Sequence, residues 1–86
     1  MARDTGRVLR VIAEMPAGQQ ASAALVAETY EMDASFVIAA VRELAATGYI
    51  QATEAGDCPI VQGITPLGRR WVASHHASVA HSFWGT

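Results

Sequence analysis

The sequence predicts a mainly α-helical domain that carries one small β-hairpin. Three observations lead to this prediction. Apolar residues recur at helical spacing in the first half of the chain, two short strand-like runs flank a polar turn after Gly48, and a Thr-Pro pair then begins another helical segment. The 86 residues suit one domain, which we place at 1–86. The expected segments are three helices at about 4–15, 22–30 and 34–47, strands at 49–53 and 60–64, and a last helix from 66 to about 81.

The first helix is predicted from the apolar stripe of Val8, Leu9 and Ile12. Asp4 is expected to be its N-cap, and the Pro16 that follows Met15 ends it. The second helix is expected to begin at a Ser22 cap. Its inward-facing residues are predicted to be Leu25, Val26 and Tyr30.

The third helix is expected to start after Asp33, whose carboxylate can accept hydrogen bonds from the free amides of the first turn. Gly48 suits the left-handed residue that commonly closes a helix. Four apolar residues share one face at helical spacing. These are Val37, Ala40, Val41 and Leu44.

The hairpin is expected to turn at residues 54–57, and Pro59 is acceptable at the start of an edge strand because it lacks a backbone donor. Thr65 and Pro66 are typical of an N-cap and first helical residue. In the helix that follows, Leu67 and Trp71 are expected to cover the three-helix core.

Composition excludes several classes of protein. Half of the residues are hydrophobic (51%) and 16% are charged, which excludes a disordered tail. Cys58 is the single cysteine, so an intrachain disulfide is impossible, and the start of the chain does not resemble a signal peptide. With no apolar run long enough to cross a bilayer, we expect a cytoplasmic protein without a membrane partner.

We expect neither catalysis nor a bound metal or cofactor. No nucleophile is set beside a base, and there is no glycine-rich phosphate loop. His75 and His76 are adjacent, so on a helix they point about 100° apart and do not converge on one ion, and His81 lies further along.

Two short helices, a tight turn and a hairpin resemble the winged helix-turn-helix transcription regulators, in particular the MarR-like and PadR-like families. The resemblance covers roughly residues 19–72. It rests on the segment 25–33, on the apolar residues from Val37 to Leu44 followed by Gly48-Tyr49-Ile50, and on Ile64-Thr65-Pro66-Leu67-Gly68-Arg69-Arg70 after the hairpin. It implies a fold of three helices, a two-stranded wing and a C-terminal helix, and it implies a DNA-binding regulator. The chain departs from the pattern at Glu31, where such turns often have glycine, because the backbone tends to need a positive φ there.

If the third helix enters a major groove, the residues opposite its apolar face are those that reach the bases. Arg42 suits a bidentate contact to guanine, and Ser35 suits a base edge or a phosphate, while Ile38 and Ala39 offer apolar contacts. Phosphate contacts are expected from four further arginines. These are Arg7, Arg10, Arg69 and Arg70.

The charge balance favours a second hypothesis. The net charge is −2, and the hairpin turn carries Glu54 and Asp57 with no basic residue, so phosphates are repelled there. In this alternative the same fold is a protein–protein interaction module that uses Phe36, Ile38 and the acidic turn. Phe36 can instead tuck against the second helix.

A second apolar stripe on the C-terminal helix, 66–83, predicts a homodimer. A two-fold dimer of this kind would present two recognition helices to a palindromic site in double-stranded DNA. The expected interface residues are Val72, Val79 and Phe83.

Overall fold

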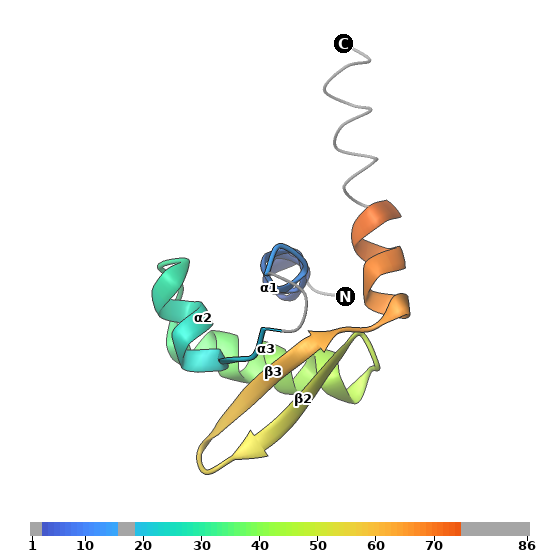
Figure 1. Cartoon of the computed structure of the whole chain (residues 1–86). Coiled ribbons are helices and arrows are strands. Elements are labelled where there is room, and N and C mark those ends of the chain that lie inside the picture. The colour runs from blue at the N-terminus through green and yellow to red at the C-terminus, as the bar shows by residue number, and fades with distance from the viewer. Residues whose placement is uncertain (1–2, 16–18, 75–86) are drawn as a thin grey trace.

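The computed structural model describes residues 3–15 and 19–74, and over these residues the predicted order of helices and hairpin is confirmed. Figure 1 shows α3 behind the β2–β3 hairpin, with α1 and α2 on the same side of the hairpin as α3. A further helix at 66–74 follows the end of β3. The elements are α1 (Arg3–Ala13), β1 (Ala21–Ser22), α2 (Ala23–Thr29), α3 (Ala34–Ala46), β2 (Ile50–Ala55) and β3 (Cys58–Ile64).

The sheet has three strands rather than the two expected. Its order is β1-β3-β2 with both pairings antiparallel, and β1 contributes only the pairs Ala21–Val61 and Ser22–Ile60. The prediction that Pro59 lies in an edge strand is therefore wrong, since β3 is the central strand. Proline is tolerated because β1 ends at Ser22, so β3 has only β2 as a neighbour at Pro59.

The hairpin strands are also longer than predicted. Glu54 and Ala55, expected in the turn, pair with Pro59 and Cys58, and the turn is reduced to Gly56 and Asp57. Gly56 has φ 64°, a value that suits glycine in a tight hairpin turn. The polar residues that suggested a turn therefore belong to the cross-strand ladder.

Side-chain caps begin three of the helices at the predicted residues. Ser22 Oγ accepts from Leu25 N at 3.1 Å, and Asp33 Oδ2 accepts from Phe36 N at 2.9 Å. Thr65 Oγ1 accepts from Gly68 N at 3.1 Å. The cap predicted for α1 is wrong, because Asp4 lies inside the helix, in its first turn. There its negative charge still interacts favourably with the helix dipole.

The core is formed where α1, α2 and α3 meet the sheet. All four residues of the predicted inner face of α3 are buried, as are Val8, Leu9 and Ile12 of α1. The prediction that Leu25 faces inward is wrong, since 51% of it is exposed. On a helix as short as α2 the core side is covered by Ala23, Val26 and Ala27, which leaves Leu25 on the other side.

The helix at 66–74 is anchored to the domain through two glycines. Trp71 packs over Gly6 of α1, where an added Cβ would lie 2.6 Å from Trp71 Cη2. Gly68 is buried against the backbone of Tyr49. The prediction that Trp71 covers the core is confirmed, whereas Leu67 is 45% exposed and does not cover it.

The turn between α2 and α3 has the positive φ that the resemblance implies, with Glu31 at φ 55°. Met32 N donates to Ala27 O at 2.8 Å and Glu31 N to Glu28 O at 3.3 Å, the hydrogen-bond pattern of a Schellman motif with Glu31 at the left-handed position. The same pattern closes α3, where Gly48 has φ 87°. A side chain in this conformation costs about 1 kcal/mol.

Replacing Glu31 by glycine is expected to raise the melting temperature by about 2–4 °C, since roughly half of the relieved strain is offset by the greater freedom of glycine in the unfolded chain. Thermal unfolding followed by circular dichroism measures the change. Glu31→Ala is the control, because it removes the same charge but keeps the Cβ. Equal melting temperatures for the two variants would contradict the strain at this position.

Candidate nucleic-acid interface

The outer face of α3 is exposed over much of its length, although Ile38 packs partly against the core cluster and Arg42 contacts the hairpin. Ser35, Ala39 and Arg42 are exposed and Ile38 is half-buried, while the opposite face forms the core. This arrangement follows from the helical spacing of apolar residues that sequence analysis used. Phe36 is half-buried and packs against the core cluster. This agrees with the interpretation that it tucks into its own fold, and not with a fully exposed side chain.

Arg42 is held by the hairpin. Its Nη2 donates to Glu54 Oε1 at 2.9 Å, and its Nε lies 3.2 Å from Oε1 and 3.4 Å from Oε2. Nη2 also donates to the backbone carbonyl of Asp57 at 3.3 Å. Among residues 3–15 and 19–74 this is the one ion pair. The hydrogen bonds to Glu54, together with its negative charge, raise the pKa of the Arg42 guanidinium.

The contact between Arg42 and Glu54 follows from the geometry of β2. Side chains alternate along a strand, so Glu54 shares a face with Ile50 and Ala52, the buried and half-buried residues that pack against the core. Glu54 is the last residue on that face, beyond the core, where it meets the exposed side of α3. Sequence analysis missed this pair because it placed Glu54 in the turn. The alternation of Ile50, Ala52 and Glu54 was the available signal.

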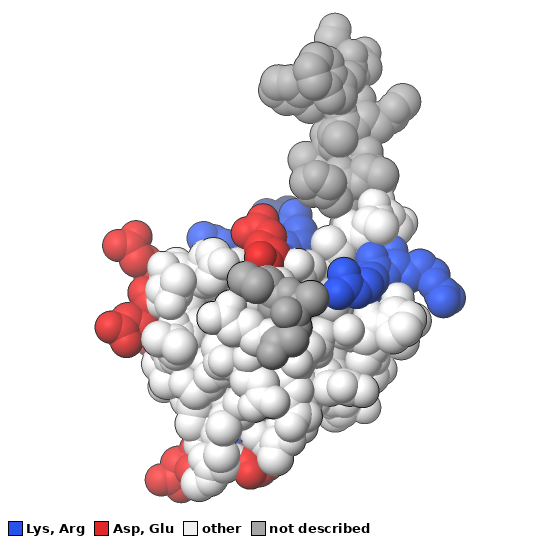
Figure 2. Space-filling view, viewed as in Figure 1, with Lys and Arg blue, Asp and Glu red and all other residues white. Residues whose placement is uncertain are grey.

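The other arginines lie around α1 and the helix at 66–74. Arg7, Arg69 and Arg70 are exposed and Arg10 is half-buried. Arg7 lines a shallow hollow beside the N-terminus of α3, together with the acidic residues Asp4, Glu31 and Asp33. Figure 2 shows basic side chains in the upper part of the view, with acidic side chains beside them and at the left edge, and further acidic side chains at the hairpin tip. The arginines other than Arg42 therefore lie away from the hairpin tip.

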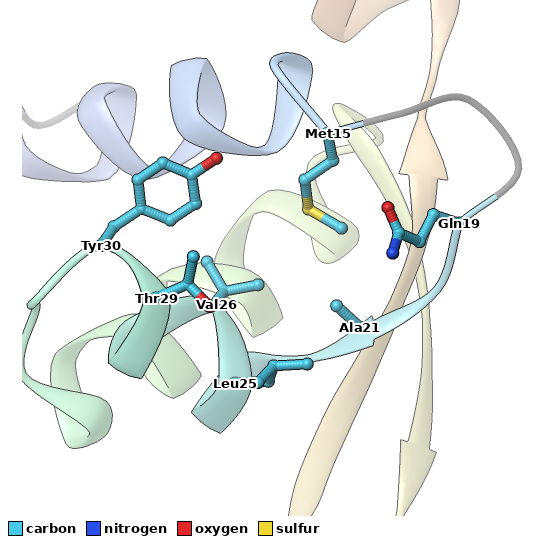
Figure 3. Close-up of a pocket in the computed structure, with 7 residues that line it drawn as sticks. All are labelled: Met15, Gln19, Ala21, Leu25, Val26, Thr29 and Tyr30. Carbon is cyan, nitrogen blue, oxygen red and sulfur yellow. The ribbon is translucent and has the colours of Figure 1, made fainter.

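A small apolar hollow opens on another side of the domain, and its volume is about 200 Å³. Figure 3 shows its side chains coming from the chain just after α1, the chain before β1, β1 itself, and α2 with its C-cap. No residue of α3 or of the hairpin lines it. The lining residues are Met15, Gln19, Ala21, Leu25, Val26, Thr29 and Tyr30.

Several predicted residues fall outside the part of the chain that the structure describes. Val79 and Phe83 of the expected dimer interface lie there, as do His75, His76 and His81. Val72 is half-buried and packs against the core cluster. Within residues 3–15 and 19–74 no group of three or more potential metal ligands is brought together, and no helix is both long and apolar enough to span a membrane.

Comparison with known proteins identifies the architecture. No protein-family model matches the chain, and neither does any curated protein. A solved structure, that of FabT from Streptococcus pneumoniae in complex with DNA, superimposes with a TM-score of 0.66 at 15% sequence identity. The match covers 99% of this chain and 61% of the FabT chain. The fold is a winged helix. The β2–β3 hairpin is its wing.

Proposed function

We propose that this protein is a DNA-binding transcription regulator that places α3 in the major groove of duplex DNA. The observation that carries the proposal is the exposed outer face of α3. The major groove is wide enough to admit an α-helix, but a helix can enter it only with a face that the rest of the fold leaves uncovered. The small side chains of Ser35 and Ala39 allow the helix to approach the base edges closely. That a protein of the same fold was solved in complex with DNA supports the proposal.

The proposed contacts divide into base contacts and phosphate contacts. Arg42 would donate to a guanine, Ser35 to a base edge or phosphate, and Ile38 and Ala39 would meet apolar groups such as a thymine methyl. Because free positive charge lies around α1 and the helix at 66–74, the phosphate contacts are assigned to these elements rather than to the wing. The residues are Arg7, Arg10, Arg69 and Arg70.

We further propose that the regulator is a homodimer of MarR-like or PadR-like type. A dimer formed through residues 66–83, with Val72, Val79 and Phe83 at its interface, would place two α3 helices on a palindromic site. The half-sites would then lie about one helical turn apart, roughly 34 Å.

A second candidate function is protein–protein interaction, and one observation favours it. Arg42, the only basic residue of α3, is already paired with Glu54, and Asp57 adds a further negative charge at the wing. This surface would suit a basic partner protein. Under this alternative Arg42→Ala leaves partner binding nearly intact, whereas under the first it relaxes base preference in DNA.

A salt titration tests the proposed function. Four arginines on each of two protomers correspond to about eight phosphate contacts, so raising the salt from about 50 to 200 mM is expected to lower duplex affinity by roughly 10³- to 10⁵-fold. Fluorescence anisotropy with a labelled duplex, chosen by selection from a randomised library, measures this change. The variant with Arg69 and Arg70 both replaced by alanine should show a shallower salt dependence.

No duplex binding near 50 mM salt would overturn the proposed function. Binding whose affinity does not depend on salt would also contradict it, because phosphate neutralisation is then absent.

A further inference from the structure

The pairing of Arg42 with Glu54 leaves a defined part of the guanidinium unused. Arginine carries five N–H donors. Nε and Nη2 supply the hydrogen bonds to Glu54 and to the Asp57 carbonyl, while Nη1 makes none within the described residues. The guanidinium is therefore held along one edge, and its two terminal nitrogens form a second edge away from the glutamate.

We propose that Glu54 is a positioning residue that holds Arg42 in the orientation needed to recognise one guanine. The inference rests on the proposed function and deepens it, because it assigns the wing a role in sequence specificity that needs no DNA contact. It also accounts for an acidic residue on a wing, a position where a carboxylate facing phosphates would only weaken binding.

The geometry supports this role in two ways. Two donors on one edge of the planar guanidinium contact the carboxylate, since Nε and Nη2 lie 3.2 and 2.9 Å from Oε1 and Nε lies 3.4 Å from Oε2, so the direction of the side chain is fixed as well as its distance. Both partners also stand on regular elements, since Arg42 is in α3 and Glu54 in a strand paired along its length with β3. A long side chain that would otherwise sample many rotamers is thereby restricted before DNA arrives, which lowers the entropy lost on binding.

The free edge of Arg42 matches a guanine. In the major groove guanine presents two acceptors, O6 and N7, to a pair of arginine donors. Nη1 is available, and the bond from Nη2 to the Asp57 carbonyl, at 3.3 Å, is longer than the 2.9 Å bond to Glu54. Guanine can therefore replace the carbonyl while the glutamate contact persists.

Asp57 offers a matched control for charge. It is exposed at the wing like Glu54, but it contacts Arg42 through its backbone carbonyl and not through its carboxylate. Glu54→Gln and Asp57→Asn therefore each remove one negative charge from the wing. Only Glu54→Gln changes a group that Arg42 contacts through its side chain, because it removes the charge that strengthens the two bonds to Oε1 and replaces Oε2, 3.4 Å from Nε, by an amide nitrogen that cannot accept.

The experiment compares the full chain with these two variants and with Arg42→Ala. The probes are a duplex selected from a randomised library by the unsubstituted protein and a series in which each G·C pair is changed to A·T. Changing one particular G·C pair to A·T is expected to lower the duplex affinity of the unsubstituted protein by roughly 5- to 150-fold. Arg42→Ala should lose this preference for guanine. Glu54→Gln should reduce the preference by at least about three-fold. Asp57→Asn should keep it.

Two outcomes overturn the inference, and they are distinguishable from failure of the proposed function. If Glu54→Gln and Asp57→Asn keep the same guanine preference and only raise affinity for every duplex, Glu54 acts as a repelling charge and not as a positioning residue. If Arg42→Ala has no effect on base preference, Arg42 does not contact a base. Absence of duplex binding by the unsubstituted protein instead removes the proposed function itself. Melting temperatures of the variants show whether each is folded.

Discussion

Replacing Gly68 by alanine is expected to lower the free energy of unfolding by about 3 kcal/mol, at the upper end of the cost of overpacking a buried site. The added Cβ would overlap the carbonyl oxygen of Tyr49 and lie 2.7 Å from Ile64 Cγ1. That carbonyl also accepts from Thr65 N at 3.1 Å, so the segment cannot move away without losing a hydrogen bond. Urea denaturation followed by circular dichroism measures the loss, and the melting temperature should fall by roughly 12–24 °C.

Gly63→Ala is the matched control for this prediction. Gly63 lies in β3 only five residues earlier, but a Cβ there would meet no atom within 4 Å, and its φ is not positive. We expect its free energy of unfolding to change by less than about 1 kcal/mol. If the two alanine variants are equally stable, the close approach of the helix at 66–74 to Tyr49 is not a feature of the folded protein.

Replacing Leu44 by alanine is expected to lower the free energy of unfolding by about 3 kcal/mol, within the 2–5 kcal/mol range of such core substitutions. Leu44 is 1% exposed and is among the largest fully buried side chains of the described residues. Its loss leaves a cavity between α3 and the elements packed on it. For 86 residues the whole stability is of the order of 4–13 kcal/mol, so a loss of about 3 kcal/mol would remove roughly a quarter to three quarters of it.

Leu25→Ala provides the comparison for Leu44→Ala, because the two substitutions are chemically identical and both residues lie on helices. Leu25 is 51% exposed, so its removal should change the free energy of unfolding by less than about 1 kcal/mol. Chemical denaturation of both variants tests the difference. A similar loss for the two would mean that Leu25 is buried in solution, in a partner or in a second copy of the chain.

Much of the fold was predictable because its signals are local. A cap such as Asp33 bonds an amide three residues away, and the inner face of α3 is defined by spacings of three and four residues. The Glu31 position was predictable for the same reason, since a single left-handed residue closes a helix. The candidate face of α3 follows directly, because it is the side opposite the buried one.

Only the tertiary structure decided the contacts between elements. Two residues at Ala21–Ser22 carry too short a pattern to predict a strand, and they form one only because β3 offers an unpaired edge beside them. The fit of Trp71 on Gly6 joins residues far apart in the chain. Likewise, spacing shows that Arg42 is exposed, but only the docking of β2 beside α3 shows that Glu54 reaches its guanidinium. Such contacts depend on how packed elements approach one another. The hydrophobic effect that drives this packing is non-directional, so the spacing of apolar residues does not specify which elements meet or at which residues.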